Sequence, residues 1–417
     1  MPKIIASNNI PDLLKENMLV YMPDCAGESL YIAKILKDNP DCAKNIHFIG
    51  VWIPGVNNFD YTQLHPSTTA TSFFVTPALK NSFIANKLNF VPLHYSDVTP
   101  YLQTKTYDIA FLQVSAPDKE GNCSFGIAAD FPPSIIENTK IIVAHINPKM
   151  PSTQNSPSIP FAKLDYIIEK EYDLIEYDLG EANDTLIKLG SNVASLIKDG
   201  DTIQIGIGKI QSTVLSPLKD RKNLKLHGGM ICDPLMDLIS SGAVASDYDK
   251  KIPITTGVAV GSAKFYEYIS NRDDIEFKTV THTHDIDVLS SIDNLVAINS
   301  AIEIDLLGQA NAEMIKGKQV SGGGGLVDFL RGGRRSKGGK AIVALVSTTS
   351  DKKTSRIVNN FENTTITTVP RADIDYVITE NGIADLRGKS SKERAIELIE
   401  KAAASQFKEE LFSNLNK

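Results

Sequence analysis

The stretch LIKDGDTIQI (Leu196–Ile205) repeats the pattern of LLKENMLVYM (Leu13–Met22), in which a helix end, a polar turn and a strand follow one another. A glycine-containing loop and an apolar helix follow each stretch. A second matching pair comes later, KNIHFIGVWI (Lys44–Ile53) and KNLKLHGGMI (Lys222–Ile231). The two pairs are offset by 183 and 178 residues, in the same order. These offsets favour a duplicated α/β unit over a short-period repeat or a coincidence between unrelated α/β segments.

Short apolar runs alternate with amphipathic stretches along the chain. The runs are rich in Val and Ile and are bounded by Gly, Pro or polar residues, as buried strands of a mainly parallel sheet are. They are Ile46–Ile53, Tyr107–Val114, Ile141–Ile146, Thr202–Ile207, Ala341–Val346 and Tyr376–Thr379. Helices are predicted between the runs, for example over Asp184–Lys198 and over Ser391–Ala403, where Ser390 or Ser391 is available as the N-cap.

The alternation of strands and helices predicts an α/β fold made of two related open α/β domains. The length of 417 residues alone allows two or three domains, at roughly 150 residues per domain. The internal repeat reduces this to two, because the second unit begins shortly after residue 180. We therefore predict one domain over residues 1–180 and a second over residues 181–417.

Composition excludes several classes of protein. Hydrophobic residues make up 42% and charged residues 22%, which is ordinary for a globular protein. The net charge of −7 gives no electrostatic reason to bind nucleic acid or an anionic membrane. No membrane helix and no secretory signal are expected, since long apolar runs are missing from the sequence. Four widely spaced cysteines predict reduced thiols and a cytoplasmic protein.

Seven histidines are scattered along the sequence, and the one close pair is His282 and His284 in THTHD. If this segment is a strand, alternation places both imidazoles on one face. A metal site is one interpretation of such a pair. We predict no metal, because the sequence offers no evident third ligand.

Two glycine-rich segments are candidate ligand loops. In the first, SGGGGLVDFLRGG, Gly322, Gly323, Gly324 and Gly325 allow close approach of a backbone to a ligand, and LVDFLRGG has the pattern of a helix start and end. The N–H groups and dipole of that helix would suit a phosphate. Basic side chains follow the loop, namely Arg331, Arg334, Arg335, Lys337 and Lys340. The second segment, GIGKIQ, contains Gly206 and Gly208. Neither is a Walker A motif, and a tight turn is the alternative for each.

Several longer motifs resemble those of the acetyl-CoA hydrolase/transferase family, which includes 4-hydroxybutyrate, butyryl and acetate CoA-transferases. They cover nearly the full length and read DIAFLQVSAPDKEGNCSFG, HINPKMPST, IQIGIG, NSAIEIDLLGQANAE, SGGGGLVDFLRGG, SKGGKAIVAL and VITENGIADLRGKS. The resemblance implies two similar α/β domains with the active site in the cleft between them. It implies acyl-CoA and a small carboxylic acid as substrates, no permanently bound cofactor, and a homo-oligomer. Coenzyme A is then expected at Gly206, Gly208, Gly322–Gly325 and Lys340 of the second domain.

In active transferases of this family, a glutamate attacks the acyl-CoA thioester and forms an acyl-glutamyl anhydride, which CoA thiolate opens to a glutamyl-CoA thioester. A second carboxylate then takes the CoA. The family places this glutamate in a His/Tyr-Ser/Thr-Glu-Met/Val motif. Here the motif reads His227-Gly228-Gly229-Met230, so Gly229 stands where the nucleophile is expected.

The catalytic residue is therefore left open. Glu28, Asp233 and Glu303 are weak substitutes for the nucleophile, as are Glu313 and Glu380, whose alternative role is to fix loops by hydrogen bonds. The leading prediction is a CoA-transferase that acts on acyl-CoA and a small carboxylate. The alternatives are an acyl-CoA thioester hydrolase and a protein that binds CoA or acyl-CoA with little catalysis. Gly229 would favour the two alternatives if it enlarges the pocket for a bulkier acyl group.

Overall fold

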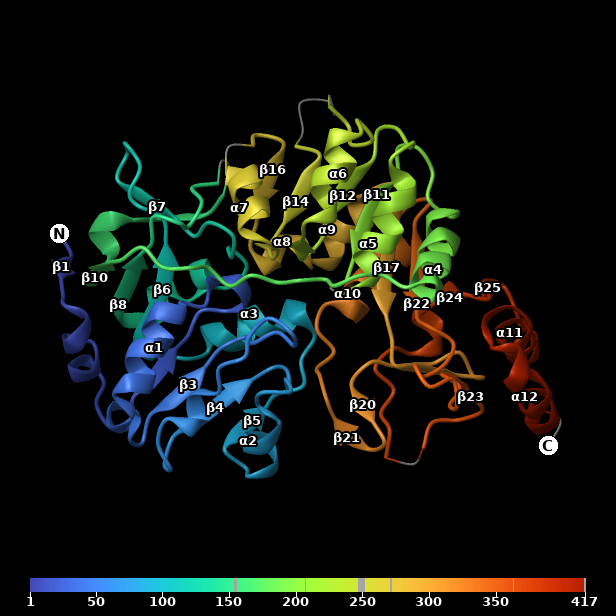
Figure 1. Cartoon of the computed structure of the whole chain (residues 1–417), viewed down its shortest axis with the longest axis horizontal. Coiled ribbons are helices and arrows are strands. Elements are labelled where there is room, and N and C mark those ends of the chain that lie inside the picture. Colours follow the sequence, from blue (N-terminus) through green and yellow to red (C-terminus); the bar gives the residue numbers. More distant parts are fainter. Residues whose placement is uncertain (154–155, 207, 247–251, 271, 363, 416–417) are drawn as a thin grey trace. The chain divides into compact units, whose positions relative to one another are not determined.

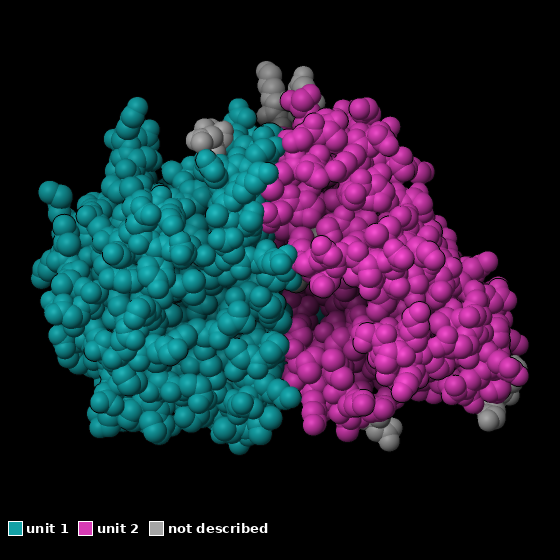
Figure 2. All heavy atoms as spheres, viewed as in Figure 1, with its two compact units in different colours: residues 1–178, 255–282 teal, residues 179–254, 283–417 magenta. Residues whose placement is uncertain are grey.

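The computed structural model describes all residues except 154–155, 207, 247–251, 271, 363 and 416–417. The chain forms two compact units, coloured separately in Figure 2. Unit 1 contains Met1–Asp178 and Thr255–His282, and unit 2 contains Leu179–Ile254 and Thr283–Lys417. The division into domains at residues 180 and 181 stays a prediction.

Unit 1 is built on a sheet of eight parallel strands, in the order β1-β10-β8-β6-β2-β3-β4-β5. The strands are β1 (Lys3–Ile4), β2 (Leu19–Tyr21), β3 (His47–Ile49), β4 (Thr69–Ser72), β5 (Leu88–Phe90), β6 (Tyr107–Val114), β8 (Thr139–Ile146) and β10 (Tyr166–Glu169). The short strands β7 (Asn122–Ser124) and β9 (Ser158–Pro160) form a separate antiparallel pair. Helices α1 (Leu30–Asp38), α2 (Lys80–Ile84) and α3 (Tyr95–Gln103) connect strands of the main sheet.

The segment Thr255–His282 belongs to unit 1 through backbone pairing. The Ala129 N–H donates to the Gly257 carbonyl at 3.0 Å, and the Ala259 N–H donates to the Ile127 carbonyl at 2.8 Å. The elements of this part of the chain are β14 (Ile254–Thr256), β15 (Val258–Ala259), α7 (Ala263–Ser270), β16 (Ile275–Phe277) and α8 (Val280–Thr283).

In unit 2, six strands lie side by side in the order β12-β11-β17-β22-β24-β25. All neighbours in this series are parallel except β24 and β25. The strands are β11 (Thr202–Ile205), β12 (Lys225–His227), β17 (Leu295–Ser300), β22 (Lys340–Ala344), β24 (Tyr376–Thr379) and β25 (Gly382–Asp385). Smaller strands are β13 (Met230–Ile231), β18 (Glu303–Asp305), β19 (Ala310–Asn311), β20 (Met314–Ile315), β21 (Lys318–Gln319) and β23 (Ile357–Val358). The helices are α4 (Asp184–Ala194), α5 (Ile210–Leu215), α6 (Pro234–Ser240), α9 (Ile286–Ser291), α10 (Leu326–Arg335), α11 (Ser391–Glu397) and α12 (Lys408–Leu415).

The two sheets share one strand order, which confirms the prediction of two related α/β domains. In unit 1 the series β3-β2-β6-β8-β10 is parallel, and in unit 2 the series β12-β11-β17-β22-β24 is parallel. The repeated sequences fall on matching strands, with LLKENMLVYM leading into β2 and LIKDGDTIQI into β11. The second pair falls on β3, which pairs with β2, and on β12, which pairs with β11 (β11 and β12 are labelled in Figure 1).

Most predicted elements are present at the predicted places. The runs Tyr107–Val114 and Tyr376–Thr379 are strands with those bounds, and each of the others overlaps a strand that is shorter, longer or slightly shifted. The end of the run Thr202–Ile207 lies outside the described residues. Helix α4 begins after Asn183, whose side chain accepts a hydrogen bond from the Leu186 N–H. Helix α11 begins after Ser390, which forms a capping box with Glu393.

The prediction that LVDFLRGG ends a helix at its glycines is wrong. Helix α10 continues through Gly332 and Gly333 to Arg335. A β-carbon at Gly332 would lie 2.5 Å from Cβ of Leu289, and one at Gly333 would lie 2.7 Å from the carbonyl oxygen of Lys340. These glycines let α10 pack closely against its neighbours in unit 2, so their role is close approach rather than helix termination.

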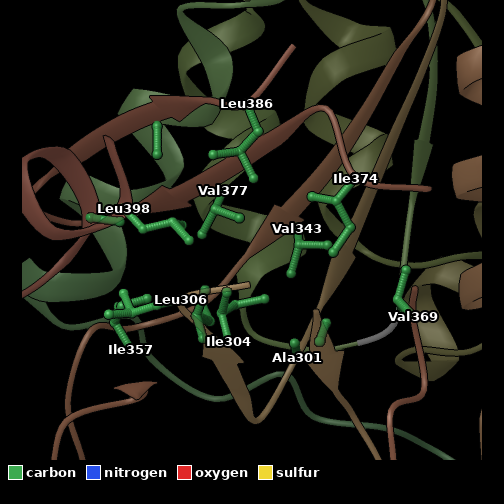
Figure 3. Packing of buried hydrophobic residues seen from close by; sticks show 14 of the residues in the cluster. Ala301, Ile304, Leu306, Val343, Ile357, Val369, Ile374, Val377, Leu386 and Leu398 are labelled. Carbon is green, nitrogen blue, oxygen red and sulfur yellow. The ribbon is translucent and has the colours of Figure 1, made fainter. Parts of the chain in front are cut away.

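The core of unit 2 lies where strands β18, β22, β23 and β24 meet the C-terminal helices. Figure 3 shows apolar side chains from these segments converging, including Ile304, Val343, Ile357, Val377 and Leu398. All five are fully buried. Full burial of such a side chain stabilises a fold by roughly 1.5–3 kcal/mol. Among the described residues, no helix is both long and apolar enough to span a membrane.

Candidate functional site

Gly229 lies in the turn between β12 and β13, two residues after the end of β12. Its φ is outside the left-handed region, so the backbone conformation does not demand glycine there. A β-carbon at this position would lie 2.8 Å from Cε1 and 3.1 Å from Nε2 of His284. Contacts below 3.0 Å are essentially never made by a real β-carbon. The space beside Gly229 is therefore filled by an imidazole ring and is not left open for a larger acyl group.

A second glycine approaches the same edge of the ring. A β-carbon at Gly325 would lie 2.5 Å from both Nε2 and Cδ2 of His284, and 3.0 Å from Cε2 of Phe329. Gly325 is the residue before helix α10 and has a φ of −86°. Two glycines from segments almost a hundred residues apart therefore flank Nε2 of one histidine, and each has to lack a side chain for that arrangement to exist.

His284 is buried and positioned by its neighbours. Its Nδ1 is 2.8 Å from the hydroxyl oxygen of Thr283, and its ring lies 4.5 Å from the ring of Phe329 at an angle of 47°. Burial, together with a smaller contribution from nearby His227, lowers the pKa of His284 from 6.5 to about 3. The imidazole is therefore neutral at physiological pH. His227 is positioned as well, with Nε2 3.2 Å from the carbonyl oxygen of Thr283.

Gly206 and Gly228 lie beside a buried amide pair. Gln204 on β11 and Asn299 on β17 exchange two hydrogen bonds of 2.8 and 3.3 Å. A β-carbon at Gly206 would lie 3.0 Å from Oδ1 of Asn299, and one at Gly228 would lie 3.4 Å from Cγ of Gln204. Gly208 has a φ of 124°, which glycine adopts without strain. Gly206 and Gly228 thus both approach the Gln204–Asn299 pair, so Gly206 lies near the turn that contains Gly229.

The loop Ser321–Gly325 is supported by a glutamate that the sequence placed among the weak substitutes. A β-carbon at Gly323 would lie 3.5 Å from Oε1 of Glu313, whose other oxygen accepts a hydrogen bond from Nε2 of Gln319 at 3.1 Å. Gln319 also donates to the carbonyl of Ser321 at 2.9 Å. Glu313 therefore contacts the glycine loop and helps to hold it. The loop leads directly into α10, where the N–H groups of the first helical turn point toward the helix start.

Lys340 lies apart from these glycines. It begins β22, whereas Gly206 and Gly229 follow the carboxyl ends of β11 and β12. In a parallel sheet, the amino-terminal ends of all strands lie on one side and their carboxyl-terminal ends lie on the opposite side. The Lys340 ammonium is 3.4 Å from the carboxylate of Asp201, and both side chains are largely buried. Gly206, Gly208 and Gly229 therefore follow the carboxyl ends of strands, and the loop 322–325 precedes helix α10. Lys340 lies at the opposite, amino-terminal ends of the strands.

The other carboxylates proposed as substitutes already have hydrogen-bond partners or lie elsewhere. Glu28 belongs to unit 1, where its two oxygens accept hydrogen bonds from Asn57 and Tyr61, each at 2.8 Å. Glu303 accepts from Asn311 at 2.9 Å. Glu380 accepts from the N–H and the hydroxyl of Ser347 at 2.9 and 2.5 Å. Asp233 directly precedes α6. A catalytic role for any of them stays a prediction.

The segment THTHD is not a strand, because Val280–Thr283 form the short helix α8 and His284 follows it. Strand alternation therefore does not place His282 and His284 on one face. Within the residues that the structure describes, no group of three or more His, Cys, Asp or Glu side chains is arranged to hold a metal ion. His284 instead packs against Gly229 and Gly325, a contact that the sequence did not indicate beyond the histidine pair itself.

The chain is similar to known proteins in both sequence and fold. Residues 1–176 match the acetyl-CoA hydrolase/transferase N-terminal domain, and residues 261–415 match the C-terminal domain of the same family. The chain is 33% identical to 4-hydroxybutyrate coenzyme A transferase of Clostridium kluyveri, over 100% of this chain and 97% of that protein.

Two solved structures share the fold. The crystal structure of RipA from Yersinia pestis has a TM-score of 0.91 and 28% identity, over 99% of this chain and 97% of that chain. The crystal structure of 4-hydroxybutyrate CoA-transferase from Porphyromonas gingivalis has a TM-score of 0.82 and 30% identity, with the same two coverages. By its two domain matches and its full-length similarity, the chain belongs to the acetyl-CoA hydrolase/transferase family.

Proposed function

We propose that this protein cleaves the thioester of an acyl-CoA and transfers the CoA to a small carboxylate. The observation that carries the proposal is the match to a CoA transferase over the whole chain, combined with the glycine loop that leads into α10. Such a loop presents backbone N–H groups to an anionic or carbonyl-bearing ligand. The proposed CoA contacts are Gly206, Gly208 and Gly322–Gly325.

The chemistry has to proceed without a glutamate at position 229. The acceptor carboxylate can itself attack the thioester carbon, so that a C–O bond forms while the C–S bond breaks and CoA leaves as a thiolate. The thiolate then attacks the acceptor carbonyl of the mixed anhydride, which releases the original acyl group as a carboxylate. Because thioester and anhydride are both activated acyl groups, neither step demands a covalent bond to the protein.

Hydrolysis is a second candidate function, and Gly229 is the observation that favours it. Without a carboxylate nucleophile on the protein, water can compete with the acceptor for the thioester carbon. Gly229 also fits a third candidate, in which the protein binds acyl-CoA with little turnover. The three candidates differ in what becomes of the CoA.

One assay separates them. Purified protein is incubated with acetyl-CoA, butyryl-CoA or 4-hydroxybutyryl-CoA, with and without a second carboxylate such as acetate or butyrate, while new thioesters and free thiol are both measured. Acceptor-dependent formation of a new thioester supports transfer, and free thiol that appears without an acceptor supports hydrolysis. Binding in calorimetry without either product supports the third candidate. Absence of binding would remove acyl-CoA as the ligand.

The proposal includes a cytoplasmic homo-oligomer that holds no cofactor permanently. The four cysteines are free thiols, which suits a reducing compartment. Native mass spectrometry of the purified protein tests both the subunit number and the absence of a bound group, and fractionation of the source cells tests the compartment.

A further inference from the structure

Two carboxylic acids lie side by side in the interior of unit 1. Asp24 lies between strand β2 and the 3-10 helix Cys25–Gly27, and Asp130 follows residues 127–129, which pair with residues 257–259. Both residues are fully buried, and their side chains are hydrogen-bonded to each other. Ionised carboxylates only accept hydrogen bonds. A hydrogen bond between the two therefore requires a proton on one of them.

The donors around the pair place this proton on Asp24. Both oxygens of Asp130 already accept hydrogen bonds, Oδ1 from the Phe131 N–H and Oδ2 from the Tyr95 hydroxyl, each at 3.0 Å. Oδ1 of Asp24 accepts from the Tyr21 hydroxyl at 3.3 Å. Oδ2 of Asp24 is buried and receives no hydrogen bond from an N–H or O–H group of the described residues. It is therefore the oxygen that carries the proton and donates it to Asp130.

The surroundings keep the pair from ionising twice. Burial raises the pKa of Asp24, and so do the charge of Asp130 and the hydrogen bond to it. Burial also raises the pKa of Asp130, although its hydrogen bonds to Asp24 and Tyr95 oppose the shift. Within the described part of the chain, no basic side chain forms an ion pair with either carboxyl. The titratable groups that face the pair are neutral or acidic, namely Tyr21, Cys25, Glu28 and Tyr95, with Tyr107 next to Tyr21.

The pair joins two segments of backbone that are tightly packed. A β-carbon at Gly27 would lie 2.9 Å from Cβ of Ala128, so the turn 24–28 lies directly against residues 127–130. The turn also contains backbone strain, because Cys25 has a φ of 44° in the left-handed region. Its conformation is therefore maintained by contacts with its surroundings, and the hydrogen bond between Asp24 and Asp130 is one of them.

We infer that Asp24 and Asp130 form a pH-sensitive switch, in which one shared proton holds the turn 24–28 against residues 127–130 and loss of that proton opens the contact. On opening, the O–H bond at Oδ2 of Asp24 breaks, its electron pair stays on the oxygen, and the proton passes to water. Two carboxylates then repel each other in a buried site that offers no cation, so the turn separates and both become hydrated. The switch belongs to unit 1 and does not depend on the proposed reaction.

The switch opens as pH rises. In the open state Asp24 has its ordinary pKa of 3.8, whereas in the closed state its pKa is raised. Opening therefore releases a proton at every pH between these two values. The equilibrium constant for opening grows about tenfold for each pH unit in that window. Closure is complete below the ordinary pKa of Asp and is lost progressively as pH rises toward the raised one.

Hydrogen–deuterium exchange of the wild type and of Asp24→Asn tests the switch. The substitution places an amide N–H where the protonated oxygen lies, so it keeps the hydrogen bond to Asp130 and removes the titration. At each pH the two proteins are compared, so that the intrinsic effect of pH on exchange cancels. We expect peptides covering residues 24–28 and 127–130 to exchange faster in the wild type, by a ratio that grows about tenfold per pH unit. The exposed Asp41→Asn is the control and should follow the wild type.

Infrared spectroscopy at neutral pH tests the proton itself. Glu28→Gln is used as the background, because Glu28 also has a raised pKa. This protein should show the carbonyl band of a protonated carboxyl group, and Asp24→Asn in the same background should lack it. The inference is overturned if the band is missing before Asp24 is changed, or if exchange in both segments has the same pH dependence in the wild type and in Asp24→Asn. If Asp24→Asn does not fold, the presence or absence of the band in Glu28→Gln decides.

Discussion

A β-carbon on Gly229 would lie 2.8 Å from Cε1 of His284, so these two residues occupy the same small region of unit 2. Gly229 is thus required by the packing of unit 2, because the histidine ring fills the space that any side chain there would need. The pairing has consequences for stability and for attempts to restore the family motif.

Gly229→Ala should destabilise the protein. The added methyl group overlaps the His284 ring, and forcing extra atoms into a packed site typically costs about 1–3 kcal/mol. The matched control is Gly228→Ala, whose β-carbon would meet only Cγ of Gln204 at 3.4 Å. Chemical denaturation of both variants checks the difference. Equal stability of the two would contradict the described position of the ring.

Gly229→Glu alone should not produce a transferase that works through a glutamyl intermediate, because the new side chain and the imidazole compete for one space. The double variant Gly229→Glu/His284→Ala removes the ring and leaves room for the glutamate. We expect intact-mass spectrometry after mixing with acyl-CoA to show a CoA adduct on the double variant and none on either single variant. An adduct on Gly229→Glu alone would mean that His284 moves aside readily.

Glu28 makes the stability of unit 1 depend on pH. Burial raises the pKa of its carboxyl from 4.5 to about 7, although Asn57 and Tyr61 oppose the shift. Between these two values the unfolded chain releases a proton that the folded protein keeps. The free energy of unfolding is therefore highest below pH 4.5 as far as this group is concerned, and falls by about 3 kcal/mol as pH rises to 7.

Glu28→Gln removes that titration, so the variant should lose about 3 kcal/mol less than wild type over this window. Urea denaturation at several pH values measures it. Asp24 and Asp130, whose pKa values burial also raises, titrate in both proteins and cancel in the comparison. The exposed Glu120→Gln is the charge control. Parallel pH curves for wild type and Glu28→Gln would show that the carboxyl is not protonated in the folded protein.

Sequence reasoning succeeded where local composition determines structure. The strands Tyr107–Val114 and Tyr376–Thr379 are marked by apolar runs that end at turn-forming residues. The duplication could be predicted from the sequence because the patterns of strand, loop and helix recur in the same order in both halves. Predictions were less accurate where packing decides, as at Gly332 and Gly333, which permit close helix packing although isolated glycines favour helix ends.

The site could be predicted only in part, for a related reason. Position 229 and the glycine loop are visible as motifs, but the packing of His284 against Gly229 and Gly325 involves three segments that meet only in the folded chain. The buried pair of Gln204 and Asn299 is another example, because its members lie on neighbouring strands 95 residues apart in sequence. Such contacts cannot be predicted from a local sequence pattern.

Lys340→Met separates a structural lysine from a CoA contact. Because the substitution leaves the buried carboxylate of Asp201 without its cation, we expect stability to fall by about 3–5 kcal/mol. The KM for acyl-CoA should stay within about twofold of wild type, since Lys340 lies at the amino-terminal ends of the strands and Gly206 and Gly229 follow their carboxyl-terminal ends. Asp201→Asn in the same chain should restore part of the loss. A tenfold rise in KM at unchanged stability would support the CoA contact predicted from sequence.

The most direct test of the whole account is the transfer of CoA by the wild-type protein from butyryl-CoA to isotopically labelled acetate, followed by mass spectrometry of both the products and the protein. The account predicts labelled acetyl-CoA, any hydrolysis appearing as free CoA, and no CoA adduct on the protein at any time. Failure to bind or cleave the thioester, or a CoA adduct on a carboxylate of the wild-type chain, would contradict it.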